Sequence, residues 1–175
     1  MTLKANVRHA ADAVVKAFAP TPDDAAARDI LDTLKKEHNE VKALLSDLQD
    51  AQAPGERRAL VQKIKKALVP HTKAEEKVVY NAVIGLRSRD AQTDGYEGYL
   101  EHEWASKTLQ RLDSIANASS PEHRAAGKVL KELVEHHISE EERNIWADVK
   151  KNFSDEDRVS MNVAFESAKR RVKTS

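Results

Sequence analysis

Residues 71–83 have the sequence HTKAEEKVVYNAV, and residues 137–149, HISEEERNIWADV, match them without a gap. The match pairs His71 with His137 and Glu75 with Glu141, so each segment contains the pattern H-x-x-x-E. On a helix, two side chains four residues apart share one face and are separated by about 6 Å along the axis. The two segments therefore predict two helices of similar role, each presenting an imidazole and a carboxylate on one face.

A weaker repeat precedes each of these segments. Glu37-His38 lies upstream of the first segment and Glu101-His102 upstream of the second. His38 precedes His71 by 33 residues, and His102 precedes His137 by 35. A near-twofold arrangement of two helix pairs would bring one histidine from each of the four helices to a common level.

Apolar residues recur at intervals of three and four between clear breaks, which indicates amphipathic helices. The breaks are Ala53-Pro54-Gly55, Thr93-Asp94-Gly95 and Ser120-Pro121-Glu122. We therefore predict an all-α fold, an up-down-up-down four-helix bundle spanning residues 23–152. A helical extension in residues 1–20 and a C-terminal helix in residues 154–175 complete a single domain of residues 1–175.

The composition supports this fold class and limits the function. Charged residues make up 33% of the 175 residues and aromatic residues only 5%, with five glycines and five prolines, a profile that favours helices. Basic and acidic residues are balanced at 29 each, which gives no support for binding nucleic acid or a membrane surface. The absence of cysteine excludes disulfides and thiolate metal sites. With no signal-like or membrane-spanning apolar run, we expect a cytoplasmic protein.

Histidines and glutamates interrupt the predicted apolar stripes at positions where the helical period demands buried residues. A buried imidazole or carboxylate is costly unless it is paired or bound to a metal. We therefore predict a two-metal cage with two bridging carboxylates and terminal imidazoles. Mixed imidazole and carboxylate ligation suits iron, with manganese or zinc as alternatives. The predicted ligands are His38, His71, Glu75, His102, His137 and Glu141.

Over about residues 28–150, these motifs resemble those of the hemerythrin-like, or HHE cation-binding, domains. The resemblance implies a four-helix bundle with two non-haem iron ions, histidines as terminal ligands, and Glu75 and Glu141 as bridges. Oxygen-carrying hemerythrins have a second histidine four residues after the third-helix ligand, where this chain has Ser106. The departure points to the subset with four histidines and two glutamates, which is similar to di-iron proteins linked to iron–sulfur repair and nitric oxide stress.

Two classes of function remain open from the sequence. The first is a di-iron protein that binds or senses dioxygen, nitric oxide or peroxide, or that stores or delivers iron. The second is a di-iron enzyme that consumes peroxide or nitric oxide, or that contributes to iron–sulfur centre repair. Oxygen-activating ferritin-like enzymes use more carboxylates, which favours the first class here. The electron donor is not identified, and a monomer or weak dimer is expected.

Other polar residues near the motifs receive simpler interpretations. Successive helical residues are about 100° apart, so His136 and Glu140 are expected off the ligand stripe. His136 is expected either at the surface or in support of a ligand, and not as a ligand itself. Glu37 and Glu101 also lie off the stripe, as do Glu76 and Glu142, and for the last two the sequence leaves open whether they support the cage from its edge. His9 and His123 lie near predicted helix starts and are expected to be solvated. Tyr80 and Trp146 are expected as core aromatics, with shielding of the metals as a functional alternative. Pro70 is expected to kink its helix.

Overall fold

The computed structural model describes residues 28–174. The helical extension expected in residues 1–20 lies outside the described residues. Within the described part, the chain forms helices and no strand. These helices are α2 (Ile30–Asp50), α3 (Pro54–Glu75), the π-helix η1 (Glu76–Tyr80), α4 (Asn81–Ile84), α5 (Arg89–Ser114), α6 (Pro121–Arg143), α7 (Ile145–Asn152) and α8 (Asp155–Lys169).

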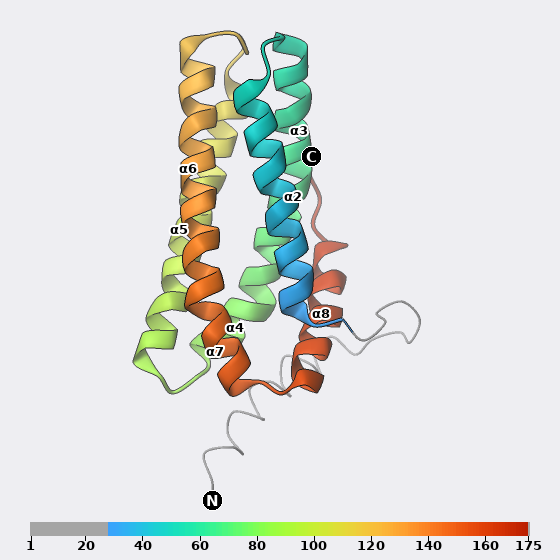
Figure 1. The fold of residues 1–175 in the computed structure, drawn as a ribbon, viewed down its shortest axis with the longest axis vertical. Coiled ribbons are helices and arrows are strands. Elements are labelled where there is room, and N and C mark those ends of the chain that lie inside the picture. Colours follow the sequence, from blue (N-terminus) through green and yellow to red (C-terminus); the bar gives the residue numbers. More distant parts are fainter. Residues whose placement is uncertain (1–27, 175) are drawn as a thin grey trace, which may run out of the picture.

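Four long rods form the bundle, and they run alternately up and down (Figure 1). The first rod is α2, and the second consists of α3, η1 and α4 in direct succession. The third rod is α5, and the fourth is α6 followed by α7. Each rod packs against the rods that precede and follow it, and α2 also packs against α6, which closes the ring. The predicted four-helix architecture is therefore confirmed.

Side-chain caps explain where several rods begin. The Asp29 carboxylate accepts a hydrogen bond from the Leu31 amide at 2.9 Å at the start of α2. Ser120 caps α6, whose first residue is Pro121, a position where the missing N–H of proline costs nothing. Ser154 starts α8 through a reciprocal capping box with Asp157.

The break predicted at residues 93–95 is wrong, because this segment lies inside α5. The chain turns earlier, between Ile84 and the helix cap Ser88. Gly95 has a packing role: a Cβ at this position would lie 2.7 Å from Cγ1 of Ile84. The glycine therefore allows α5 to approach the second rod closely, and its presence does not mark a turn.

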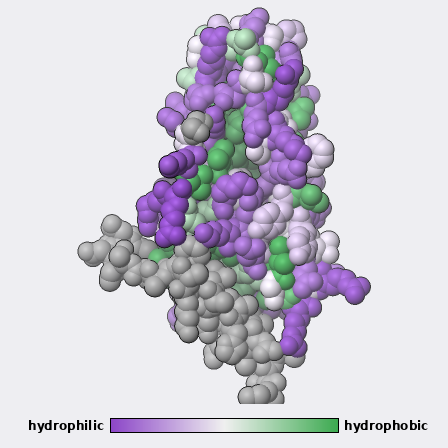
Figure 2. Space-filling view, turned by 180° about the vertical axis from the view of Figure 1, so that it is seen from behind, coloured by the Kyte–Doolittle hydropathy of each residue, from purple (hydrophilic) through white to green (hydrophobic). Residues whose placement is uncertain are grey.

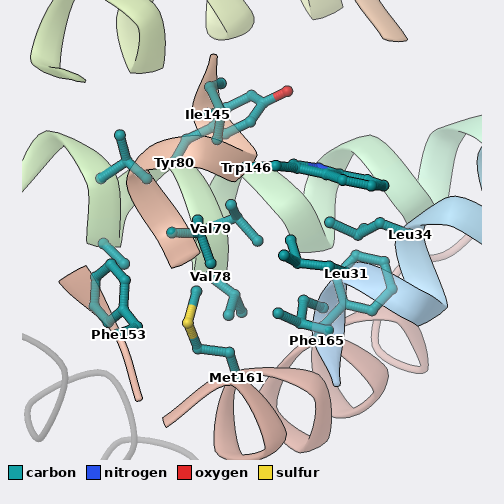
Figure 3. Packing of buried hydrophobic residues seen from close by; sticks show 14 of the residues in the cluster. Leu31, Leu34, Val78, Val79, Tyr80, Ile145, Trp146, Phe153, Met161 and Phe165 are labelled. Atoms are coloured by element: carbon teal, nitrogen blue, oxygen red, sulfur yellow. The ribbon is translucent and has the colours of Figure 1, made fainter. Parts of the chain in front are cut away.

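Helix α8 lies along one side of the bundle, against α2, α3 and η1. Met161 and Phe165 of α8 point toward Val78 and Val79, and Trp146 lies across the same cluster (Figure 3). Lys169 near the end of α8 pairs with Glu37, and Arg158 pairs with Asp29 at 2.6 Å. The helix covers the α2–α3 half of the bundle, and none of the other described helices covers the α5–α6 half in the same way.

The hydrophobic interior consists of two clusters. One cluster surrounds Val79, Trp146 and Phe165 at the α8 end, and the other surrounds Leu45, Ile64 and Leu130 at the opposite end. The predicted metal-ligating residues lie along the rods between these two clusters. The outer surface is largely polar on the face shown in Figure 2, with small scattered apolar areas. None of the described helices combines the length and apolar character needed to cross a membrane.

Candidate metal centre

The structure brings all six predicted ligands together in the middle of the bundle. Donor atoms of His38, His71 and Glu75 lie within 4.8 Å of one another, and so do donor atoms of Glu75, His102 and His137. The two triplets share Glu75. Each triplet is a candidate site for a cation, and the two candidate sites have the Glu75 carboxylate in common.

Each buried glutamate contacts one histidine from each triplet. Oε2 of Glu75 lies 3.3 Å from Nε2 of His71 and 3.5 Å from Nε2 of His102. Oε2 of Glu141 lies 3.5 Å from Nε2 of His38 and 3.5 Å from Nε2 of His137. Both carboxylates therefore connect the two halves of the cage, as bridging ligands would.

The donor set fits a metal because several of its atoms have no other partner. The side chains of Glu75 and Glu141 are 0% exposed. Nε2 of His38, Oε1 of Glu75 and Oε2 of Glu141 are buried and make no hydrogen bond. Such buried polar atoms are costly unless they meet a ligand or ion. These three atoms face the same cage, which is the arrangement that a carboxylate-bridged metal pair would satisfy.

Four further glutamates hold the outer nitrogens of the four histidines. The Nδ1 atoms lie 2.6–3.3 Å from a carboxylate oxygen, in the pairs His38–Glu142 (3.1 Å), His71–Glu37 (2.9 Å), His102–Glu76 (3.3 Å) and His137–Glu101 (2.6 Å). A carboxylate at Nδ1 fixes the imidazole with its proton on that nitrogen and directs the Nε2 lone pair inward. Carboxylates of this kind orient metal-binding histidines in proteins.

These outer pairs follow the internal duplication. Glu37 and Glu101 each precede a histidine by one residue, and each binds the histidine of the following rod. Glu76 and Glu142 each follow a bridging glutamate, and they bind His102 and His38, respectively. The sequence placed Glu37 and Glu101 off the ligand stripe, and their contact is to a neighbouring helix.

Local distortion of two helices brings one aromatic residue to each bridging glutamate. A π-helical turn over Glu76–Tyr80 places the Tyr80 hydroxyl 3.5 Å from Oε2 of Glu75. In the second copy, the helix is interrupted at Asn144, and Nε1 of Trp146 donates to Oε1 of Glu141 at 3.2 Å. A regular α-helix would turn residue i+5 about 140° away from residue i, so the distortions are what allow these contacts.

Tyr80 and Trp146 serve different halves of the cage. The Tyr80 hydroxyl lies 3.2 Å from Nε2 of His102 and 3.2 Å from Nε2 of His137. The Trp146 ring stacks on His38 with ring centroids 5.8 Å apart. Both aromatics are core residues, as expected, and their polar atoms also reach the cage.

Burial and charge divide the four histidines into two kinds. Burial lowers the pKa of both His38 and His102 to about 4, so these imidazoles are neutral near pH 7. For His71, burial disfavours the charged ring, but attraction by Glu75 and the hydrogen bond to Glu37 raise the pKa to about 10. For His137, burial also disfavours the charged ring, but the hydrogen bond to Glu101 raises the pKa to about 10.

The two buried glutamates, Glu75 and Glu141, also have opposite pKa shifts. Burial and the charge of Glu141 raise the pKa of Glu75 to about 7. Burial would also raise the pKa of Glu141, but its close contact with His137 and the attraction of His38 hold it well below its usual range. The protonated imidazoles balance the buried carboxylates, and a bound cation takes over that role when it displaces their protons.

A small pocket adjoins the four histidines. Its lining combines these imidazoles with Thr72 and the apolar side chains of Val41, Leu68, Ala105, Val134 and Ile138. Its free volume is about 10 Å³, close to the space that one water needs. Ser106, which replaces the fifth histidine of oxygen carriers, is outside this lining and lies 3.5 Å from the Gln110 amide.

Two histidines outside the six lie in different environments. The His136 side chain is 64% exposed, in agreement with the prediction of a surface position. The prediction that His123 is solvated is wrong, because only 2% of this residue is exposed. Its Nδ1 accepts hydrogen bonds from the buried Arg57 guanidinium at 3.2 and 3.3 Å. Nothing in the local sequence around His123 indicates this distant partner.

Comparison with known proteins identifies the family. Residues 29–147 match the Hemerythrin HHE cation binding domain, which covers more than half of the chain. The chain belongs to this family. All six predicted ligands of this HHE domain lie within the matched residues. The resemblance noted from the motifs is thereby confirmed, and the His and Glu clusters are candidate sites for the bound cation.

A longer curated relative shares part of this HHE domain. The chain is 29% identical over 143 residues to a protein of Nostoc sp. (strain PCC 7120 / SAG 25.82 / UTEX 2576) named "DNA nickase". The alignment covers 82% of this chain but 40% of the relative, so most of that protein has no counterpart here. No solved structure matches the chain.

Proposed function

We propose that the chain is a non-haem di-iron protein that reversibly binds or senses a small ligand such as dioxygen, nitric oxide or peroxide. The observation that supports this proposal most strongly is the pair of His/Glu triplets that share Glu75. His38 and His71 would hold one ion, and His102 and His137 the other. Glu75 and Glu141 would bridge the two ions.

The cage dimensions support a small ligand over a large organic substrate. The pocket beside the four histidines has a volume of about 10 Å³ and a mostly apolar lining. A bound iron pair supplies reversible redox and ligand-binding chemistry, while the protein residues orient the imidazoles and exclude water. Two buried carboxylates against four imidazoles stabilise ferric iron less than a carboxylate-rich set would. This balance favours reversible ligand binding, or storage and delivery of iron, over oxidation of organic substrates.

The direct test is the metal content of freshly purified protein, with absorption spectra before and after reduction. We expect two iron atoms per chain and a charge-transfer band that reduction removes. Glu75→Ala/Glu141→Ala should lose the iron, whereas the control Glu122→Ala/Glu132→Ala removes two exposed carboxylates and should retain it. One zinc per chain, or iron retained without both bridging glutamates, would overturn the di-iron assignment.

A di-iron enzyme that consumes peroxide or nitric oxide is the second candidate, and the position of Tyr80 favours it. A buried phenol that contacts two cage imidazoles and Glu75 can donate a hydrogen bond to a ligand inside the site. Burial and the nearby carboxylates raise the pKa of Tyr80, so the hydroxyl keeps its proton for this role. Ligand binding gives a stoichiometric spectral change that then stops, whereas an enzyme gives many turnovers. Turnover that Tyr80→Phe abolishes, with the iron content unchanged, would select the enzyme.

DNA cleavage is not part of the proposed function. The name "DNA nickase" belongs to a longer relative, of which this chain covers only 40%. The 29 basic and 29 acidic residues of this chain give no net attraction to a phosphate backbone.

A further inference from the structure

A second pocket reaches the cage from the surface between α5 and α6. Its lining runs from the exposed Glu97 to the buried His137 and Glu141. Carboxylates dominate the polar part of this lining, which contains no lysine or arginine: Asp94, Glu97, Glu101, Glu140 and Glu141. Its volume of about 10 Å³ is enough for one water-sized species. The pocket therefore offers a negatively charged path to one half of the cage.

Two carboxylates of this lining, Glu101 and Glu140, form with the neighbouring His136 a cluster that has the composition of a metal site. Donor atoms of Glu101, His136 and Glu140 lie within 4.8 Å of one another. Nε2 of His136 lies 3.5 Å from Oε1 of Glu101 and 3.7 Å from Oε2 of Glu140. One imidazole and two carboxylates suit first-row divalent cations. The other oxygen of Glu140 binds Arg143 at 2.9 Å, which leaves Oε2 facing His136.

A cage residue lies at the inner end of the same pocket. Glu141 lines the pocket with its side chain 0% exposed, and its Oε2, which has no hydrogen-bond partner, lies 3.5 Å from Nε2 of both His38 and His137 inside the cage. Glu101 connects the two ends, because its Oε1 faces His136 while its Oε2 lies 2.6 Å from Nδ1 of His137. A cation at the outer cluster would thus be one carboxylate away from a cage histidine.

The other copy of the repeat lacks this cluster. The positions equivalent to His136 and Glu140 are Pro70 and Ala74. Glu37 is the counterpart of Glu101, and its carboxylate oxygen that does not contact His71 pairs with Lys169 from α8. The pocket beside that pair has a volume of about 120 Å³ and includes both Lys66 and Lys169 in its lining. The pocket on one side of the cage therefore combines two lysines with two glutamates, whereas the α5–α6 pocket on the other side is lined by carboxylates without a lysine or arginine.

From this asymmetry we propose that Glu101, His136 and Glu140 form a surface site that captures a divalent cation and passes it through the α5–α6 pocket to the cage. The inference rests on the proposed function, because it assumes that the cage takes up metal. Burial and neighbouring carboxylates raise the pKa values of both Asp94 and Glu97, as expected in a region of negative potential. Such a potential raises the local concentration of cations and the rate of their association.

The test measures the uptake of Co²⁺, a visible probe, by the full chain after removal of metal with a chelator. Stopped-flow absorbance at low ionic strength gives the rate, and titration gives the number of ions bound. We expect His136→Gln/Glu140→Gln to load the cage about tenfold more slowly, to the same final two ions. A weaker additional equivalent seen in the native chain should be lost. Glu132→Gln, which removes one exposed carboxylate elsewhere on α6, should load at the native rate.

The outcomes separate the two proposals. Uptake of two ions at the native rate by the double variant would overturn the surface site and leave the cage intact. An equal slowing in Glu132→Gln would also overturn it, because the effect would then reflect net charge alone. A native chain that takes up no cobalt into the cage would instead refute the proposed function.

Discussion

Gly98 is the position where a single methyl group should disturb the cage most clearly. A Cβ built at Gly98 lies 2.7 Å from Cε2 and 2.8 Å from Cζ of Tyr80. To restore a carbon–carbon contact of about 3.5 Å, the Tyr80 ring has to move by about 0.8 Å. Its hydroxyl now lies 3.2 Å from the cage nitrogens of His102 and His137. A shift of this size away from them would exceed the hydrogen-bond range.

The stability change follows from two opposing effects. Alanine is favoured over glycine inside a helix by about 1 kcal/mol. Overpacking a fully buried site costs about 1–3 kcal/mol, and Tyr80 is 0% exposed. Gly98→Ala should therefore lower the free energy of unfolding by up to about 2 kcal/mol. At Gly127, the nearest atom to an added Cβ is 3.4 Å away, an ordinary contact. Gly127→Ala should accordingly be stabilising.

The assay compares thermal unfolding of both variants, followed by circular dichroism. A difference of about 2 kcal/mol corresponds to about 4–8 °C in Tm for a chain of this size. In a Tyr80→Ala background the overlap disappears, and Gly98→Ala should then become stabilising, which a double-mutant cycle detects. Equal effects of the two glycine substitutions, or an unchanged effect in that background, would refute the reasoning.

Three further predictions concern the cage and its surroundings. Tyr80→Phe should lower the free energy of unfolding by about 1 kcal/mol and leave the metal-to-protein ratio unchanged; a lower ratio would place the phenol among the ligands. Metal uptake, measured by pH-stat, should release about three protons at pH 5.5 and about two at pH 8.5. His71 and His137 have pKa values of about 10, so each releases a proton at both pH values. Glu75 has a pKa of about 7 and releases a proton only at pH 5.5. A proton count that rises with pH would contradict this assignment. Arg57→Met removes hydrogen bonds to two backbone carbonyls and should lower the free energy of unfolding by about 3 kcal/mol with normal metal content; loss of metal would show that this region supports the cage.

The fold and the six candidate ligands could be predicted from the sequence because both depend on helical periodicity. A residue at i+4 shares a face with residue i whatever its neighbours are, so the H-x-x-x-E segments placed His71 with Glu75 and His137 with Glu141. The repeat supplied the remaining two histidines. Their ligation of metal stays a prediction, although the structure brings all six residues together.

The outer carboxylates were harder to predict because they depend on how helices pack. Glu37 lies off the ligand stripe of its own helix, and its contact with His71 exists because α2 and α3 are neighbours. The buried Arg57–His123 pair joins residues 66 positions apart, which no local pattern reports. The π-helical turn over Glu76–Tyr80 was likewise not predicted, because the apolar period around it is that of a regular helix.

The division of the interior into two hydrophobic clusters has a consequence for how the protein unfolds. The cage forms a polar layer between them, and ionic and hydrogen-bonded contacts span this layer in place of continuous apolar packing. Without a bound cation, each end of the bundle is expected to open on its own, as a separate cooperative unit. Ions held by residues from all four rods would join the two units into one, so that amide exchange at both ends slows together when metal is added.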